Sequence, residues 1–121
     1  VNFMKEKEII KLQSQTLYNS LQNGDIHGKF FYKSILHNAA TMEIFSNNFD
    51  GISYEKLCLK IPKTIGSRSS IQNLLNEGID KNIFVKIEST KDKRIKKYYL
   101  SKEFNQMILD WIKDQKKIYN I

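Results

Sequence analysis

The sequence has one cysteine, one proline and five glycines, and no apolar run approaches the roughly 20 residues that a membrane-spanning helix needs. Cys58 alone cannot build a disulfide framework. The first residues, VNFMKEKEII, show no basic region followed by an apolar core, so no secretory signal is visible. We therefore expect a cytoplasmic protein without a membrane partner. A length of 121 residues suits a single domain spanning 1–121.

Residues for catalysis and metal binding are equally scarce. His27, His37 and Cys58 lack metal-ligand spacing, and Cys58 falls on an apolar helical stripe, where we expect it in the core. No nucleophile–base–acid set, glycine-rich phosphate loop or pair of catalytic carboxylates can be found. We therefore expect no enzyme activity, no catalytic residue, no cofactor and no metal site.

Positive charge is abundant, and it is concentrated in one segment. The net charge is +7, and residues 51–101 hold eleven cations against five acids, whereas the two flanking segments are nearly neutral. The only two arginines, Arg68 and Arg94, both fall in this basic segment. Such a concentration is typical of proteins that bind nucleic acid. The alternative is a solvated surface in a lysine-rich protein.

Hydrophobic spacing predicts two helices in the first half of the chain. One spans about 6–21, and a turn follows at Asn23-Gly24-Asp25. The next spans about 29–46. Its expected core stripe, at three- and four-residue spacing, consists of Phe31, Ile35, Ala39, Met42 and Phe45.

Two serines predict the starts of two further helices. Ser53 can cap a short helix that Pro62 ends, and Ser67 can cap a fourth helix over about 67–81. The apolar stripe of this fourth helix consists of Ile71, Leu74, Leu75 and Ile79. Its opposite face is polar and nearly free of acids, which favours contact with base edges and phosphates.

The pattern then changes to that of a β-hairpin. Strands are expected at 84–88 and 97–100 around a tip at 89–96, with Val85 and Ile87 on the same side as Tyr98 and Leu100. The spacing of apolar residues from Phe104 onward predicts a final helix. Three helices followed by a basic hairpin is the order of a winged helix. The expected fold class is thus mainly α with a small β-hairpin, a winged helix-turn-helix.

The basic hairpin and the helix before it resemble the MarR family of bacterial transcription regulators. Asp92, Arg94, Leu100 and Ser101 match the family's Asp-x-Arg and Leu-Thr pattern at the same spacing, and residues 67–84 are similar to its recognition helix and following turn. This resemblance implies that Arg94 enters the minor groove while Asp92 holds its guanidinium, and that the polar face of the fourth helix meets the major groove. The alternative for Asp92 and Arg94 is a local surface ion pair.

The predicted DNA-binding residues follow from the resemblance and the basic segment together. The recognition helix is expected at about 67–81 and the wing at 89–97. The complete set is Lys63, Thr64, Ser67, Arg68, Ser69, Ser70, Gln72, Asn73, Lys91, Asp92, Lys93, Arg94, Lys96 and Lys97.

Three positions depart from the family pattern. Gly78 stands where a core leucine is usual, so the helix is expected to bend or end early there. Asn82 replaces a glycine before the first strand, and asparagine tolerates the left-handed conformation. Phe104 stands where a glycine often follows the Leu-Thr. The connection from about residue 60 to Ser67 is also longer than in a tight helix-turn-helix.

MarR-like proteins are dimers, which implies that residues 1–28 and 102–121 are dimerisation helices around a DNA-binding core at 29–101. Independently, the terminal segments carry much apolar surface for a homodimer to bury. Aromatic residues at 30–32, 45 and 49 could line a pocket for a small-molecule effector. The expected partner is double-stranded DNA; the alternatives are a protein-interaction module, or a nonspecific or RNA-binding architectural protein. The apolar residues of the terminal segments that a homodimer is expected to bury are Ile9, Ile10, Leu17, Leu21, Trp111, Ile112, Ile118, Tyr119 and Ile121.

Overall fold

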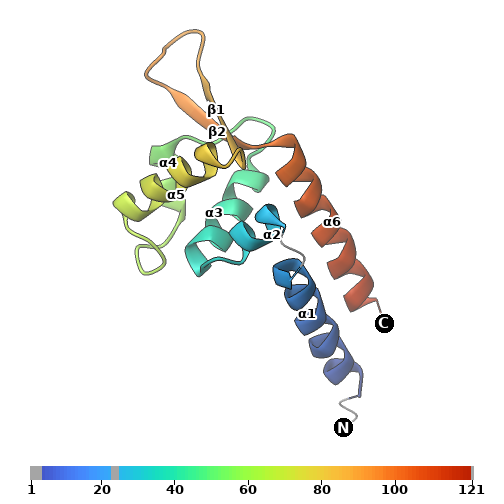
Figure 1. The fold of residues 1–121 in the computed structure, drawn as a ribbon. Helices are drawn as coiled ribbons and strands as arrows, with labels where there is room; N and C mark the ends of the chain where they lie inside the picture. Colours follow the sequence, from blue (N-terminus) through green and yellow to red (C-terminus); the bar gives the residue numbers. More distant parts are fainter. Residues whose placement is uncertain (1–3, 23–24, 121) are drawn as a thin grey trace.

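A computed structural model describes residues 4–22 and 25–120. It contains six helices and one antiparallel two-stranded sheet within these residues (Figure 1). In chain order these are α1 (Met4–Gln22), α2 (Ile26–Phe31), α3 (Ile35–Ser46), α4 (Tyr54–Lys60), α5 (Arg68–Asp80), β1 (Phe84–Glu88), β2 (Lys96–Leu100) and α6 (Lys102–Tyr119). The mainly helical fold with a small hairpin is confirmed.

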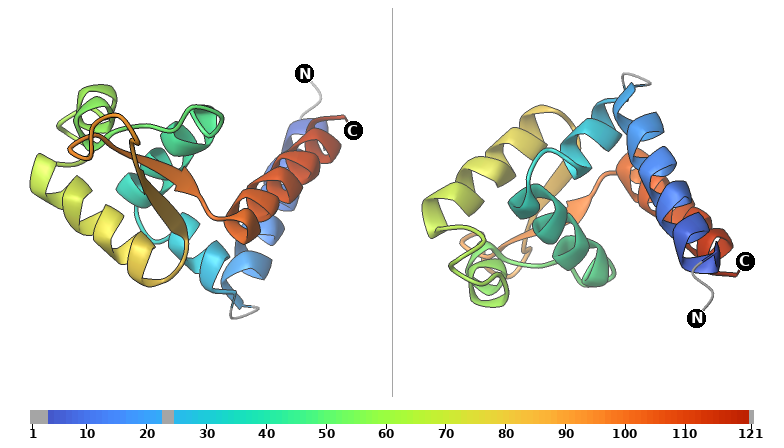
Figure 2. Two further views of the ribbon diagram at one scale, coloured as in Figure 1. Left: turned by 90° about the horizontal axis from the view of Figure 1, so that it is seen from above. Right: turned by 90° about the horizontal axis from the view of Figure 1, so that it is seen from below.

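The molecule consists of a head and an arm. The head, residues 26–100, packs α2 to α5 together, and the β1–β2 hairpin projects from it (Figure 1). The arm consists of α1 and α6, which lie side by side in all views (Figure 2). The glutamine amides of Gln13 and Gln115 join the two helices by hydrogen bonds of 2.5 and 3.1 Å.

Serines start four of the helices by accepting a hydrogen bond from a free backbone N–H. The Ser53 hydroxyl accepts from the N–H of Lys56, and the Ser67 hydroxyl accepts from that of Ser70, which confirms both predicted starts. Ser101 begins α6 in the same way. Helix α4 ends at Lys60, two residues before Pro62, as predicted.

The helix expected at 29–46 is wrong, because the chain breaks at residues 32–34. Asp25 caps α2, and Ser34 takes an extended conformation and caps α3 by accepting from the N–H of His37. The break also rotates the buried face of α3, whose buried residues are Ala40, Thr41 and Ile44. The expected stripe is therefore wrong as well: Ile35 and Met42 are exposed. Of the turn expected at 23–25, residues 23 and 24 lie outside the described residues.

The expected faces of the hairpin are wrong too. Phe84 pairs with Leu100 and Lys86 with Tyr98, so Phe84 shares the core-facing side with Tyr98 and Leu100. Val85 and Ile87 point to the opposite, exposed side. Because side chains alternate across a strand, burial of Phe84 places Val85 on the exposed side and Lys86 on the same side as Phe84.

Gly78 explains why Phe84 can be buried. A Cβ at residue 78 would overlap the Phe84 ring, so the glycine lets β1 pack directly on α5. The expected bend or early end at Gly78 is wrong, because α5 continues to Asp80. Asn82 takes the left-handed conformation at φ 58°, as its sequence position suggested.

The core lies under α5 and the hairpin. The rings of Phe30, Phe84 and Phe104 pack edge to face at its centre. Phe104 belongs to α6, so the first turn of α6 is part of this core, and Phe31 packs against Trp111 further along. Cys58 is half-buried against the core. None of the helices in the described part is long and apolar enough to cross a membrane.

Candidate nucleic-acid interface

A groove of about 630 Å³ runs between helix α5, helix α4 and the hairpin. Gln72 lines it from α5, and Arg94, Lys96 and Lys97 line it from the wing. These four residues, predicted as DNA contacts from different parts of the sequence, therefore share one surface. The other residues that line the groove are Ser53, Tyr54, Glu55, Lys86, Ile95 and Tyr98.

Asp92 holds Arg94 at the tip of the wing. One carboxylate oxygen accepts from the Arg94 backbone N–H at 3.0 Å and from Nε at 3.1 Å, and the other oxygen accepts from an Nη at 3.1 Å. These hydrogen bonds lower the pKa of Asp92. The guanidinium is otherwise open, because the Arg94 side chain is 91% exposed. The wing thus presents an oriented but accessible arginine.

Arg68, at the start of α5, is held in a similar way by α4. Its guanidinium donates to Glu55 at 2.6 Å and lies over the Tyr54 ring, 5.2 Å from the centroid. The hydrogen bond and charge of Glu55 raise the pKa of Arg68. The Tyr54 hydroxyl donates to the Arg68 backbone carbonyl at 3.0 Å. Helix α4 thereby fixes the first turn of α5 and the arginine on it.

The remaining predicted residues at the start of α5 are exposed, apart from the half-buried Gln72, and most are bonded to near neighbours. The hydroxyls of Ser67, Ser69 and Ser70 form hydrogen bonds of 2.9 and 3.2 Å. Gln72 donates to Asn76 at 3.1 Å. All of these groups can exchange their partners for base or phosphate atoms without uncovering a buried polar group.

Only four of the fourteen predicted residues line the groove, and ten do not. Lys63 and Thr64 lie in the exposed connection before α5, and Lys91 and Lys93 are exposed on the outer part of the wing. The other six lie beside the groove, on or next to α5 and the wing: Ser67, Arg68, Ser69, Ser70, Asn73 and Asp92. Conversely, the sequence interpretation missed Glu55 and Lys86. The Ser53 cap was a usable signal for Glu55, because it places residue 55 in the first turn of α4. Lys86 could only be found once the strand register was known.

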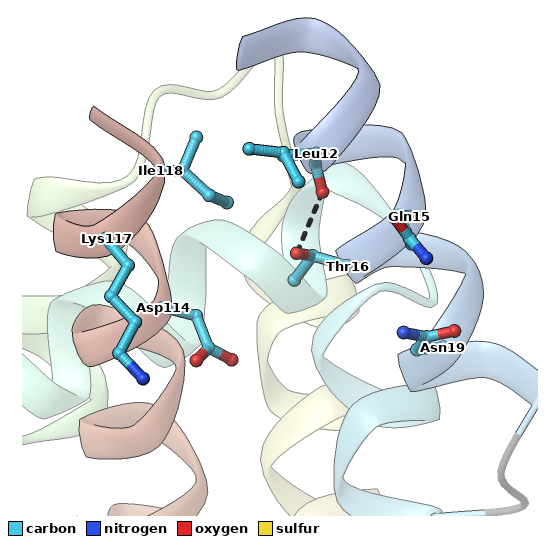
Figure 3. A pocket seen from close by; sticks show the side chains of 7 residues that line it. All are labelled: Leu12, Gln15, Thr16, Asn19, Asp114, Lys117 and Ile118. Carbon is cyan, nitrogen blue, oxygen red and sulfur yellow. Dashed lines mark hydrogen bonds between the residues drawn. The ribbon is translucent and has the colours of Figure 1, made fainter. Parts of the chain in front are cut away.

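The aromatic effector pocket does not form as expected. Phe30 and Phe31 are buried in the core, and Phe49 is 98% exposed on a loop. A different cleft, of about 320 Å³, lies between α1 and α6 (Figure 3). Leu12 and Ile118 form its apolar part, and Asp114 and Lys117 supply charge from α6. In the described residues no group of three or more histidine, cysteine, aspartate or glutamate side chains could hold a metal ion.

Neither a family model nor a curated protein sequence matches this chain. Solved structures do match. S. aureus MepR bound to ethidium bromide is 14% identical over 99% of this chain and 76% of that chain, with a TM-score of 0.61. The transcriptional regulator PA4135 is 17% identical over 83% and 75% of the two chains, with a TM-score of 0.52.

A mutant of Lactococcus lactis ZitR in apo form is 12% identical over 70% of this chain, with a TM-score of 0.53. The match spans only 62% of that ZitR chain. These neighbours are MarR-family regulators. The chain has the MarR-type winged-helix fold. In this chain α5 directly precedes the β1–β2 hairpin, which is the element order expected for a winged helix.

Proposed function

We propose that the protein binds specific sequences in double-stranded DNA and thereby regulates transcription as a homodimer. The groove supports this most directly, because it joins Gln72 of the recognition helix to Arg94 and Lys96 of the wing on one surface. A duplex laid along this surface would meet hydrogen-bonding groups from α5 and positive charge from the wing together. The MarR-type fold is consistent with this arrangement.

The proposed interface makes two kinds of contact with DNA, one through the wing and one through α5. The wing lysines and Arg94 neutralise phosphates or enter the minor groove, and each neutralised phosphate releases a condensed counterion. Helix α5 enters the major groove, where Gln72 and Asn73 can donate to and accept from base edges. The wing thus supplies most of the affinity and α5 most of the specificity.

The recovery of bound sequences from a random duplex pool tests this function. An inverted repeat with half-sites about 34 to 36 Å apart is expected, because a two-fold dimer presents two recognition helices one helical turn apart. Recovery of no preferred sequence, together with equal affinity for A-form RNA, would favour a nonspecific or RNA-binding protein. No binding to any duplex at low salt would favour a protein-interaction module.

The arm supports the homodimer. Helix α1 has no buried residue although it is 19 residues long, and Ile10, Tyr18 and Tyr119 are exposed on the arm. Because most helical stability in proteins comes from the packing of an apolar face, packing against a second copy would stabilise α1 further. Not all of the predicted surface is free, however. Ile118 is buried within the chain itself, Trp111 packs on Phe31, and residue 121 lies outside the described residues.

A matched pair of substitutions tests the arm. Ile10 in α1 is 65% exposed and Ile35 in the head is 75% exposed. We expect Ile10→Asp to lower the mass measured by light scattering toward the monomer's 14.3 kDa, and Ile35→Asp to leave the dimer intact. A monomeric wild-type protein, or equal effects of the two substitutions, would contradict the arm as the dimer interface.

The cleft between α1 and α6 is our candidate for an effector site. An apolar floor beside the Asp114 carboxylate suits a small aromatic cation (Figure 3), and ethidium is bound in the MepR structure. Titration with ethidium, followed by its fluorescence, should saturate, and Asp114→Asn should weaken the binding. Binding that never saturates, or that is unaffected by Asp114→Asn, would remove this cleft from the proposal.

A further inference from the structure

Glu77, on the flank of α5 away from the groove, has an unusual number of partners. Its Oε2 accepts from the ammonium groups of Lys33 at 2.6 Å and Lys81 at 2.8 Å. Its Oε1 lies 2.9 Å from Nε2 of His37. Partial burial by itself raises the pKa of Glu77, but the hydrogen bonds from Lys33, Lys81 and His37 outweigh it and lower the pKa to about 2. Glu77 is therefore ionised throughout the physiological range.

The partners of Glu77 lie on different elements. Lys81 is the C-cap residue that follows α5, Lys33 belongs to the three-residue connection between α2 and α3, and His37 lies in the first turn of α3. One carboxylate thus ties the recognition helix to the α2–α3 corner. This corner is the very place where the chain breaks the longer helix expected from the sequence.

The His37 ring is itself held in place. The Ser34 hydroxyl lies 2.7 Å from Nδ1, and the Phe30 ring meets the imidazole edge-on at 4.7 Å between centroids. When Ser34 donates to Nδ1, the neutral imidazole carries its proton on Nε2 and donates it to Glu77. Only 12% of the His37 side chain and 21% of the Glu77 side chain are exposed, so this contact is shielded from water.

Glu77 and its neighbour Gly78 hold the same turn of α5 from two directions. Glu77 fixes it to α3 and the α2–α3 connection, and the Phe84 ring packs on Gly78 from β1. Two such fixed points near the end of α5 determine the rotation of the helix about its own axis. This rotation decides which side chains at its start face the groove, because each residue turns by about 100°.

We propose that Glu77 is a positioning residue that fixes the rotation of α5 and so sets which of its side chains contact base edges. The inference rests on the proposed DNA-binding function, although Glu77 itself touches no DNA in it. Removal of its charge should therefore change discrimination between duplexes more than affinity for duplexes in general. A residue that serves stability alone would not alter this ratio in the folded protein.

Glu77→Gln and Glu43→Gln make a matched pair for the test. Both remove one negative charge, and within the described residues Glu43 on α3 has no side-chain hydrogen bond or ion pair. Amide hydrogen exchange at pH 7, well below the unfolding temperature, should increase in residues 68–80 and 32–37 of Glu77→Gln and stay unchanged in Glu43→Gln. Lys33→Met removes an exposed partner of Glu77 and should also increase the exchange of these residues. This second variant keeps the test possible if Glu77→Gln fails to fold.

Affinities for a selected duplex and a scrambled duplex complete the test. Glu77→Gln should lower the ratio of the two affinities by about tenfold, comparable with the loss of one good base contact, whereas Glu43→Gln should keep it. If amide exchange in Glu77→Gln equals that in Glu43→Gln, Glu77 has no positioning role, whether or not the protein binds DNA. Changed exchange with an unchanged ratio would overturn its link to specificity. A wild-type protein without any duplex preference would refute the proposed function, and exchange alone would then decide whether Glu77 fixes α5.

Discussion

Substitution of Gly78 by alanine tests how closely α5 packs on β1. An added Cβ would overlap Cδ2 of Phe84 and lie 2.6 and 2.9 Å from Cε2 and Cγ. The ring cannot move aside easily, because Phe30 and Phe104 meet it at centroid distances of 5.3 and 6.2 Å. The contact is therefore with a fixed core residue rather than with a flexible side chain.

The expected size of the effect follows from two opposing contributions. Alanine in place of glycine favours a helix interior by about 1 kcal/mol. Overpacking of a core costs about 1 to 3 kcal/mol, and the confined Phe84 ring places this site near 3 kcal/mol. The free energy of unfolding should thus fall by about 2 kcal/mol. For a chain of this size this corresponds to a decrease in Tm of roughly 8 °C.

Urea and thermal unfolding, followed by circular dichroism, measure this change. Asn73→Ala, at an exposed position of the same helix, should not lower the stability and serves as the control. Gly78→Ala should lower the free energy of unfolding less in a Phe84→Leu background than in the wild type, because the smaller leucine side chain removes the overlap. A Gly78→Ala protein as stable as the wild type would refute the close packing of β1 on α5.

Further predictions concern the groove and its charges. Arg94→Ala should weaken binding to a selected duplex by about 1 to 3 kcal/mol in fluorescence anisotropy, and Lys113→Ala, far along α6, should not; equal effects would remove Arg94 from the interface. Glu55→Gln frees Arg68 to bind a phosphate, so the slope of log affinity against log salt for scrambled duplex should steepen by about 0.9, and an unchanged slope would contradict this role. The folded-state pKa of Glu77 is about 2 against an ordinary 4.5, so its stabilisation is present above pH 4.5 and lost as the pH falls toward 2. The difference in stability between wild type and Glu77→Gln should shrink over that interval, and a constant difference would show that the ionised carboxylate is not its source.

Much of the fold could be predicted because the decisive signals are local. Ser53 and Ser67 are strong N-cap residues in front of apolar stripes, and both start helices as expected. Asn82 follows a helix at the point where the chain must turn sharply, and it takes the left-handed conformation. Each of these depends on the chemistry of one residue and its immediate neighbours.

The errors arose where the outcome depends on tertiary packing. Ser34 interrupts a continuous helical pattern, and its role as a cap shows only once its side chain accepts from His37. In β1 both Phe84 and Val85 are apolar, so alternation alone suits either face. The contact of Phe84 with Gly78 decides between the two faces, and no local pattern reveals it.

The charged and polar residues of the candidate site stand out in the sequence, but their arrangement does not. The basic wing and the polar face of α5 are visible in the sequence, and the structure places Gln72 and Arg94 on one groove. Glu55 was missed because it looks like an ordinary exposed acid until α4 is packed beside α5. Glu77 was missed because its partners at residues 33, 37 and 81 come from separate elements.

The most direct test of a single DNA-binding surface is the change in backbone amide NMR shifts when a selected duplex is added. The largest shifts should fall together on residues 67–76 of the recognition helix and its cap and on residues 91–97 of the wing, with small shifts along the arm. Shifts confined to only one of these two segments, or centred on α1 and α6, would contradict the account.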